Sequence, residues 1–557
     1  MKPITGARAL VRALQNAGVE VIFGLPGVQL DWIFHALELE QSPIRVIVPR
    51  HEQATTYMAD GYSRTSGKVG VALVVPGPGV LNAMAGLSTA YASHSRVLLL
   101  AGHIHSRAIG QELGLLHEIQ GQDAVLRSAT KACFTVTDPK DMASATALAL
   151  RTIDDGRRGP VALQLPHDVL AALFDEAQAS APPPVPAAAA ALDLAAVQRA
   201  AALLRGASSP LILAGGGVAV AQAAGPLRAL AEALQAPVVM TENARGLLPD
   251  EHPLALSVLG GQQAFAEADV VLVAGSRFVD LVGGQPVWQG PGITYIGLNN
   301  DAKALGAPRD YAIKLWADAG DGLSALTQAV GEHRNSPASE KRVQRIAQFQ
   351  AHARERIASL GTLAEYVKAL REGIPREATL VNELTQVGYL SRVAYPLHAP
   401  GRFITPGYQG TLGYAFPTGL GAAVGAGRRV YALSGDGGFG WNLQELATAA
   451  RYRIPLTLVL FNDRRFSNVH ALQQAQFGFS REVDLHNPDF GQLCAAFGVD
   501  HVRAESPQAL RGELERSEAL EGPLLIEVPV GDMANPWPLL RLQAPPATAQ
   551  QQPGDTR

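Results

Sequence analysis

Residues 429–469 read RVYALSGDGGFGWNLQELATAARYRIPLTLVLFNDRRFSNV. Two apolar runs, residues 430–433 and 456–461, have the length of buried strands, and a helical pattern lies between them at residues 441–452. Strands that are joined through a helix pair in parallel with a right-handed crossover, so both strands should end at one edge of a sheet. Because ligands of open parallel sheets bind at that edge, the stretch predicts an α/β unit with a ligand site where the two runs end.

An aspartate follows each predicted strand. Asp436 lies in the turn Gly435-Asp436-Gly437-Gly438, and Asp463 follows the second run. A glycine-rich turn leaves backbone N–H groups free at a helix N-terminus, which suits a phosphate. Two carboxylates suit Mg²⁺, which prefers a few protein oxygens together with phosphate oxygens. Residue chemistry therefore indicates a magnesium–diphosphate site, and the alternative is a glycine-rich turn with two exposed capping aspartates.

The spacing of these residues resembles the motif of thiamine-diphosphate enzymes, in which GDG, 24 residues and an asparagine pair follow one another. Here Gly435-Asp436-Gly437 is followed by residues 438–461 and then by Asn462-Asp463. The chain resembles the acetolactate synthase-like branch, in particular its large catalytic subunit. The resemblance implies thiamine diphosphate and Mg²⁺ as cofactors. It implies that the metal ligands are Asp436, Asp463 and the backbone carbonyl of Arg465, and that Gly435, Gly437, Gly438 and Phe466 also contact the cofactor.

Position 463 departs from the family pattern, because the second side-chain ligand is usually asparagine and here it is Asp463. Either residue offers an oxygen to the metal. The extra negative charge lies beside a diphosphate, and our hypothesis is that Arg464 or Arg465 offsets it.

The composition places the chain among large globular proteins. It has 557 residues, of which 47% are hydrophobic and 17% charged, with a net charge of -4. This balance gives no electrostatic reason to expect binding to nucleic acid or to a membrane surface. No apolar run is long enough for a membrane span, the N-terminus does not resemble a signal peptide, and Cys133 and Cys494 have no metal or disulfide spacing. We expect a cytoplasmic protein.

Alternating strand and helix patterns along the chain predict an α/β fold with three doubly wound parallel-sheet domains. By the resemblance, residues 1–175 form a pyrimidine-binding domain, 192–332 a central Rossmann-like domain, and 363–532 a diphosphate-binding domain. Residues 175–191 are a Pro- and Ala-rich linker, residues 340–357 a solvated connecting helix, and residues 533–557 a polar tail.

Glu52 is the first choice for the essential residue. It follows a predicted strand at residues 44–48 and opens a helix, so one alternative is a carboxylate that only stabilises the helix N-terminus. FGLPG at 23–27, RHEQ at 50–53 and PGPG at 76–79 resemble the family's pyrimidine-binding domain, with Pro76 at the cofactor. The resemblance implies that Glu52 bonds N1′ of the aminopyrimidine and favours the tautomer that takes the proton from thiazolium C2.

Three further polar residues are candidates for the active site. His117 and Gln122 lie in a predicted active-site loop at residues 103–123, although a single histidine in a loop usually faces solvent. Gln29 occupies a position where some lyases and decarboxylases of the family have a histidine for proton transfer, which argues against those branches.

The third domain supplies the remaining candidates. Gly410-Thr411-Leu412-Gly413 matches the family's turn beneath the cofactor. The resemblance implies that Leu412 bends thiamine into its V shape, that the Gly410 carbonyl binds the 4′-amino group, and that Gln386 approaches the diphosphate. The alternative for Leu412 is ordinary core packing.

The implied activity is cleavage or formation of a C–C bond next to a carbonyl, by a decarboxylase or carboligase acting on 2-oxo acids or acyloins. Leu281 and Leu472 stand where the biosynthetic synthases have an Arg and a Trp, so the acceptor should be uncharged or the substrate larger. The alternatives are an acyloin or 2-hydroxyacyl lyase, a flavin-containing pyruvate oxidase-like enzyme, and a catalytically silent homologue.

Two further expectations follow from the resemblance. The central domain of relatives holds FAD, ADP or nothing, and the turn Gly215-Gly216-Gly217 is only a weak nucleotide signal. The family's active site lies between the first domain of one chain and the third domain of another, which implies a homodimer or homotetramer.

Overall fold

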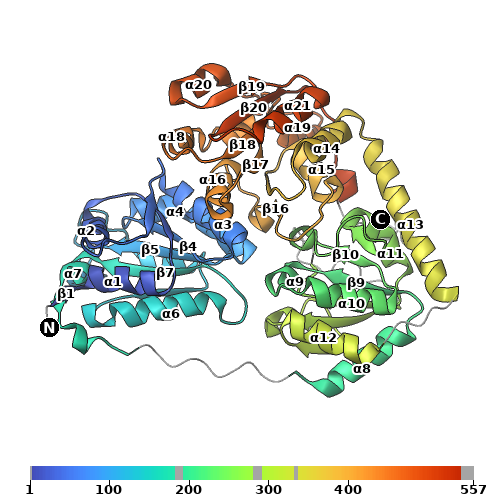
Figure 1. The fold of residues 1–557 in the computed structure, drawn as a ribbon, viewed down its shortest axis with the longest axis horizontal. Helices are drawn as coiled ribbons and strands as arrows, with labels where there is room; N and C mark the ends of the chain where they lie inside the picture. The colour runs from blue at the N-terminus through green and yellow to red at the C-terminus, as the bar shows by residue number, and fades with distance from the viewer. Residues whose placement is uncertain (1–2, 182–191, 280–291, 332–336, 541–557) are drawn as a thin grey trace, which may run out of the picture. The chain divides into compact units, whose positions relative to one another are not determined.

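The computed structural model describes residues 3–181, 192–279, 292–331 and 337–540, and within these ranges the chain forms three six-stranded sheets (Figure 1). The chain divides into two compact units. One contains residues 1–187, 369–388 and 404–533, and the other contains residues 188–368, 389–403 and 534–557. The first unit holds the N- and C-terminal sheets and the second holds the middle sheet, so the predicted α/β architecture with three parallel sheets is confirmed.

The N-terminal sheet has the strand order β3-β2-β4-β5-β7-β6, and its strands pair in parallel. Its strands are β2 (Val21–Gly24), β3 (Arg45–Ile47), β4 (Gly70–Val74), β5 (Val97–His103), β6 (Ala132–Thr135) and β7 (Val161–Pro166). The helices around it are α1 (Gly6–Asn16), α2 (Asp31–Leu39), α3 (Glu52–Ser66), α4 (Pro78–Ser93), α5 (Gln122–Arg127), α6 (Met142–Asp154) and α7 (His167–Ala171). A separate antiparallel pair joins β1 (Ile4–Thr5) to β8 (Leu173–Phe174).

The strands of this sheet are apolar along their whole length because both faces are covered. In β5, Leu98 and Leu100 belong to the core under α1 and α6, whereas Leu99 and Ala101 belong to the core under α3 and α4. Successive side chains of a strand point to opposite faces, so a continuous apolar run is what a doubly covered parallel strand requires. Figure 1 shows α1 and α6 together on one face of the sheet.

Helix α3, which begins at Glu52, crosses the C-terminal helix α16 (Ala415–Ala426) at very close range. A Cβ atom on Gly61 would meet the carbonyl oxygen of Thr418, and one on Gly421 would meet that of Met58. Both crossing positions are therefore restricted to glycine. One hydrophobic core runs through α3, α16 and strands of both sheets, and it places the start of α3 against the C-terminal domain.

The C-terminal sheet has the order β16-β15-β17-β18-β20-β19, which repeats the connectivity of the N-terminal sheet. Its strands are β15 (Leu380–Asn382), β16 (Phe403–Ile404), β17 (Val430–Gly435), β18 (Leu456–Asn462), β19 (Asp500–Arg503) and β20 (Leu524–Pro529). Its longer helices are α14 (Thr362–Gly373), α15 (Gln386–Ala394), α16, α19 (Ser467–Phe477), α20 (Phe490–Phe497) and α21 (Pro507–Ser517).

The continuous helix predicted over residues 441–452 is wrong. The connection consists of α17 (Asp436–Phe439), a 3-10 turn η8 (Leu443–Glu445) and α18 (Leu446–Arg451). Asn442 interrupts it, since its side chain donates to the Gly413 carbonyl at 2.7 Å instead of facing solvent. The buried side of this connection is partly polar, because Glu445 and Thr448 are buried beside Leu446.

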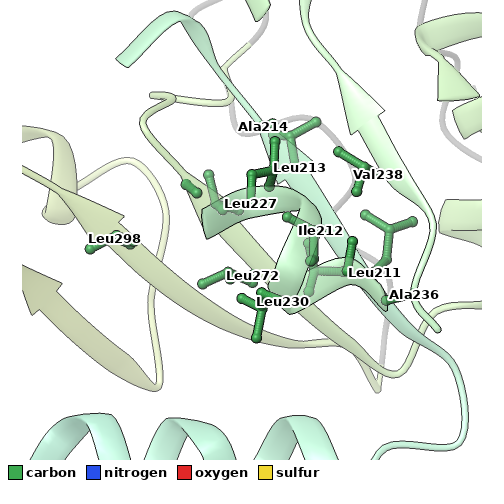
Figure 2. Packing of buried hydrophobic residues seen from close by; sticks show 14 of the residues in the cluster. Leu211, Ile212, Leu213, Ala214, Leu227, Leu230, Ala236, Val238, Leu272 and Leu298 are labelled. Atoms are coloured by element: carbon green, nitrogen blue, oxygen red, sulfur yellow. The ribbon is translucent and has the colours of Figure 1, made fainter. Parts of the chain in front are cut away.

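The middle sheet has the order β11-β10-β9-β12-β13-β14, the arrangement of dinucleotide-binding sheets. Its strands are β9 (Pro210–Ala214), β10 (Val238–Met240), β11 (Ala255–Ser257), β12 (Val270–Ala274), β13 (Thr294–Asn299) and β14 (Ile313–Trp316). Helices α8 (Leu194–Gly206), α10 (Ala224–Leu234), α11 (Val258–Glu267) and α12 (Ala319–Val330) pack on it. Figure 2 shows Leu227 and Leu230 of α10 within the same apolar cluster as Ile212 and Leu272 of the sheet.

Helix α13 (Pro337–Ala358) differs from the predicted solvated connector, because Ile346 and Phe349 are buried in the core of the middle domain. No helix in the described part of the chain is long and apolar enough to cross a membrane. Position 281, residues 182–191 of the predicted linker and residues 541–557 of the predicted tail lie outside the described residues.

Candidate cofactor and active site

Asp436 and Asp463 lie side by side at the carboxyl edge of the C-terminal sheet. Strands β17 and β18 pair in parallel with Gly435 opposite Phe461, so the residues that follow each strand meet at that edge. Asp436 Oδ2 accepts hydrogen bonds from the Arg464 backbone N–H at 2.8 Å and from the Asn487 side-chain amide at 2.6 Å. Asp436 Oδ1 also accepts the Gly437 N–H at 2.9 Å, and Asp463 Oδ1 accepts the Arg465 N–H at 3.2 Å. Hydrogen-bond donors therefore hold both predicted metal ligands in place at this edge.

The electrostatics of this edge favour a cation. Burial raises the pKa of Asp436 above its ordinary value, the Asn487 hydrogen bond offsets part of the rise, and the charge of Asp463 adds to it. Burial likewise raises the pKa of Asp463, against the effect of the Ser467 hydroxyl. Asp436 is buried and Asp463 partly buried, and the charge of Asp463 disfavours that of Asp436, so a divalent ion between them would stabilise both carboxylates.

The charge of Arg465 is directed mainly at other carboxylates. Its guanidinium lies 2.8 Å from Asp484 and 3.6 Å from Asp532, and its effect on the pKa of Asp463 is smaller than that of Ser467. The Ser467 hydroxyl donates to Asp463 Oδ2 at 2.5 Å. The Ser467 hydrogen bond therefore lowers the pKa of Asp463 more than the charge of Arg465 does, and compensation by Arg464 stays a hypothesis.

The surrounding atoms fit a magnesium-bound diphosphate. Within the described ranges no group of three His, Cys, Asp or Glu side chains could hold a metal alone, so the two aspartates need a backbone carbonyl and an outside ligand. The buried Oε1 of Gln386, at the start of α15, has no hydrogen-bond partner among the described residues. The ring of Phe466 packs against the backbone of Gly437, at the position that a Cβ atom would occupy. An unpartnered polar atom and a glycine turn beside two carboxylates suit phosphate oxygens and Mg²⁺.

Glu383 is a buried residue that the sequence reading missed. Its carboxylate accepts the backbone N–H groups of Gly413 at 2.7 Å and Tyr414 at 3.2 Å, and the hydroxyl of Ser434. It therefore holds the turn that carries Leu412, whose side chain is 41% exposed although ordinary core packing would bury it. A signal was present, because Glu383 directly follows β15 at the same sheet edge as Asp436.

The pKa of Glu383 gives a prediction about stability. Burial raises this pKa from 4.5 to about 7, and the Ser434 hydrogen bond offsets only part of the rise. Because the folded-state pKa is the higher one, the stabilising contribution is fully present below the unfolded pKa and is lost as the pH rises to about 7, by ~3 kcal/mol in all.

Glu383→Gln should remove this dependence, since the amide does not ionise. We expect the melting temperature of the variant minus that of the wild-type protein to increase by several degrees between about pH 5 and about pH 8. Calorimetric scans of both proteins at the two pH values measure it. The same difference at both pH values would contradict the buried-acid interpretation.

Glu52 opens helix α3, whose N-cap is His51. Its Oε2 accepts a hydrogen bond from the Asn82 side chain at 3.0 Å, and within the part of the chain described here its carboxylate makes no other hydrogen bond.

Gln122 is 3% exposed and links the turn at residues 76–79 to the sheet. It accepts from the Gly77 N–H at 2.9 Å and donates to the Gly102 carbonyl at 3.0 Å. Gln122 thereby positions the turn that contains Pro76.

The structure brings Gln29 and His117 together. His117 Nδ1 lies 3.1 Å from Gln29 Oε1, and Gln29 Nε2 donates to the Leu116 carbonyl at 3.3 Å. His117 has a φ angle of 65°, a left-handed conformation that is uncommon for a non-glycine residue and often marks a functional position. Val28 and Leu116, both largely exposed, flank this polar pair.

The glycine run of the middle domain has a structural explanation. Cβ atoms on Gly215 and Gly217 would collide with the backbone of Gly275 at the end of β12. The run is therefore required for packing between two strand ends, and it carries no independent sign of a nucleotide.

Comparisons with known proteins cover most of the chain. Residues 4–126 match the N-terminal TPP binding domain of thiamine pyrophosphate enzymes, residues 197–326 match the central domain, and residues 385–528 match the C-terminal TPP binding domain. The three matches follow the order of the three sheets.

Curated relatives match along nearly the full length. A probable 2-ketoarginine decarboxylase of Pseudomonas aeruginosa is 33% identical over 95% of this chain and 94% of its own. A probable acetolactate synthase large subunit of Methanocaldococcus jannaschii is 30% identical over 96% and 93%. The acetolactate synthase large subunit of Lactococcus lactis is 29% identical over 97% and 95%. The chain therefore belongs to the thiamine pyrophosphate enzyme family, among enzymes of the acetolactate synthase and 2-ketoarginine decarboxylase type.

Proposed function

We propose that this protein is a thiamine-diphosphate- and Mg²⁺-dependent decarboxylase or carboligase that acts on 2-oxo acids. The observation that carries the proposal is the pair Asp436 and Asp463, side by side at a strand edge. Gln386 Oε1 in the same domain, which has no hydrogen-bond partner among the described residues, supports it. When bound, thiamine diphosphate supplies an electron sink for cleavage of the bond next to a 2-oxo carbonyl.

We assign one set of residues to the metal and diphosphate and another to the thiamine rings. Asp436, Asp463 and the Arg465 carbonyl hold the metal, and the N–H groups after Gly435 together with Gln386 receive the diphosphate. Leu412 would support the ring system, the Gly410 carbonyl would accept from the 4′-amino group, and Glu52 would hydrogen-bond N1′. Each assignment rests on the chemistry of the side chain or carbonyl and on its position in the fold.

Gln29 and His117 are proposed to face the substrate. A polar pair flanked by the exposed apolar side chains of Val28 and Leu116 suits a 2-oxo acid with a carboxylate at one end and a longer chain at the other. Leu472, 50% exposed on α19, stands where the biosynthetic synthases have a Trp. The P. aeruginosa relative named for 2-ketoarginine supports a larger substrate than pyruvate. We favour a decarboxylase or carboligase over the biosynthetic acetolactate synthase.

The active site is proposed to form between two copies of the chain. Asn82 is the side-chain partner of the Glu52 carboxylate among the described residues, and no hydrogen bond there joins Glu52 to the Asp436 edge. Exposed apolar side chains lie near both halves, including Leu81 and Trp441. A second copy would cover them and complete the site, which gives a homodimer or a dimer of dimers.

The two buried thiols, Cys133 and Cys494, suit the reducing cytoplasm.

Titration calorimetry of the purified protein with thiamine diphosphate and MgCl₂ tests the cofactor assignment, and absence of binding heat would refute it. Product analysis with pyruvate and with longer 2-oxo acids, with and without an added aldehyde, then separates decarboxylation from ligation. We expect CO₂ release from a longer 2-oxo acid. Cleavage of an acyloin without CO₂ release would favour a lyase, a yellow protein that reduces its flavin would favour an oxidase, and bound cofactor without turnover would favour the silent homologue.

A further inference from the structure

One segment of the C-terminal domain, residues 441–452, grips the loop that carries Glu52 in the same chain. Glu445 Oε1 accepts the backbone N–H groups of Arg50 and His51, each at 3.1 Å. Gln53 Nε2 donates to the Trp441 carbonyl at 3.0 Å and to Asn442 Oδ1 at 2.9 Å. The residues immediately before and after Glu52 are therefore both held by this segment.

Glu445 itself is unusual for an acidic residue. It is fully buried, and its carboxylate is bonded by two backbone N–H groups and the Thr448 hydroxyl at 2.5 Å. Burial raises its pKa, and the charge of Arg50 is only a minor opposing influence. Removing a carboxylate from water is costly, and among the described residues no cation forms an ion pair with Glu445, so the hydrogen bonds that it accepts must offset this cost.

We propose that Glu445 is a positioning residue for Glu52: its carboxylate sets the place where helix α3 begins and so the point from which the Glu52 side chain reaches the cofactor. This inference rests on the proposed function. The N–H groups of Arg50 and His51 precede the first helical turn and have no intrahelical acceptor, so Glu445 is the group that fixes them.

The same segment also connects two tasks. It begins at Trp441, six residues after β17 ends at Gly435, and it follows α17, whose first residue is the proposed metal ligand Asp436. Within one chain, residues 436–452 therefore run from the proposed metal ligand Asp436 to the loop that precedes Glu52. Proton transfer depends on sub-ångström placement of the donor, so a shift of this loop should slow activation of the cofactor without weakening its binding.

Two conservative variants of Glu445 separate the effect of its side-chain length from the effect of its negative charge. Glu445→Gln keeps the length of the side chain, and its amide oxygen can still accept from Arg50 and His51. Glu445→Asp keeps the charge but withdraws the carboxylate by one methylene. If Glu445 acts by reach, deuterium exchange at C2 of bound thiamine diphosphate falls about 10- to 100-fold in Glu445→Asp and stays near the wild-type rate in Glu445→Gln. The matched control, Gln444→Ala, removes a neighbouring side chain and should leave the rate unchanged.

Three readouts decide the proposal. Amide hydrogen exchange of the cofactor-free protein should show lost protection at Arg50 and His51 in Glu445→Asp. Cofactor affinity by calorimetry should stay within about threefold of wild type. The double variant Glu52→Gln/Glu445→Asp should exchange C2 no more slowly than Glu52→Gln alone, because Glu445 acts only through Glu52.

Slow exchange in Glu445→Gln with a normal rate in Glu445→Asp would overturn the proposal in favour of a charge effect. Wild-type rates in both variants, or additive losses in the double variant, would overturn it outright. A wild-type protein that fails to bind thiamine diphosphate would instead refute the proposed function, so the two failures are distinguishable.

Discussion

Glu52→Gln is expected to slow deuterium exchange at C2 of bound thiamine diphosphate by about 10²- to 10⁴-fold, with a loss of turnover of the same order. The amide can still form a hydrogen bond to N1′, but it cannot share a proton, so the ring is no longer switched to the tautomer that accepts the C2 proton. Asn82 holds the Glu52 side chain at 3.0 Å and can hold the amide in the same way.

Cofactor affinity provides the check on this variant. Because the metal and diphosphate are assigned to Asp436 and its neighbours in another domain, Glu52→Gln should bind thiamine diphosphate and Mg²⁺ with nearly the wild-type Kd. Quenched-flow exchange in D₂O followed by NMR of the released cofactor gives the rate. The control is Glu38→Gln, which changes an exposed carboxyl of α2 and should alter nothing. Unchanged exchange in Glu52→Gln would remove Glu52 from the mechanism.

Asp436→Ala is expected to raise the Kd of thiamine diphosphate in the presence of Mg²⁺ by about 100-fold or more, equivalent to ~2.7 kcal/mol. The variant removes one of the two proposed side-chain ligands of the metal. The oxygen that is lost is the one that the Asn487 amide and the Arg464 N–H hold in place. Mg²⁺ demands near-octahedral geometry and tolerates the loss of a fixed ligand poorly.

Asp463→Asn is the matched comparison for Asp436→Ala. It keeps an oxygen at the second ligand position, and it removes one negative charge beside the diphosphate. We therefore expect affinity equal to or better than that of the wild-type protein, measured by the same titration with Mg²⁺ present. Collapse of binding in Asp463→Asn would show that position 463 does not act as a simple oxygen ligand.

Several parts of the fold and site were predictable because their signals are local. Residues 430–433 and 456–461 lie in strands β17 and β18 as expected. The prediction was wrong only for the continuous helix between them. The helix is interrupted because Asn442 turns inward and donates to the Gly413 carbonyl. This contact joins distant parts of the chain, so the spacing of apolar residues could not predict it. The roles of Gln29, His117 and Gln122 stay predictions, although the structure places the first two in contact.

Three features could be predicted from local sequence patterns: the three parallel sheets, the placing of Asp436 and Asp463 at one sheet edge, and the opening of a helix at Glu52. Each depends on apolar runs and on the residues that directly follow them, and a parallel sheet brings such strand ends together without further information. Contacts between distant parts of the folded chain were needed to show that Glu383 holds the Leu412 turn and that Glu445 holds the Glu52 loop. Glutamate is ordinarily a surface residue, and Glu445 is buried because it meets Arg50, 395 positions away in the chain.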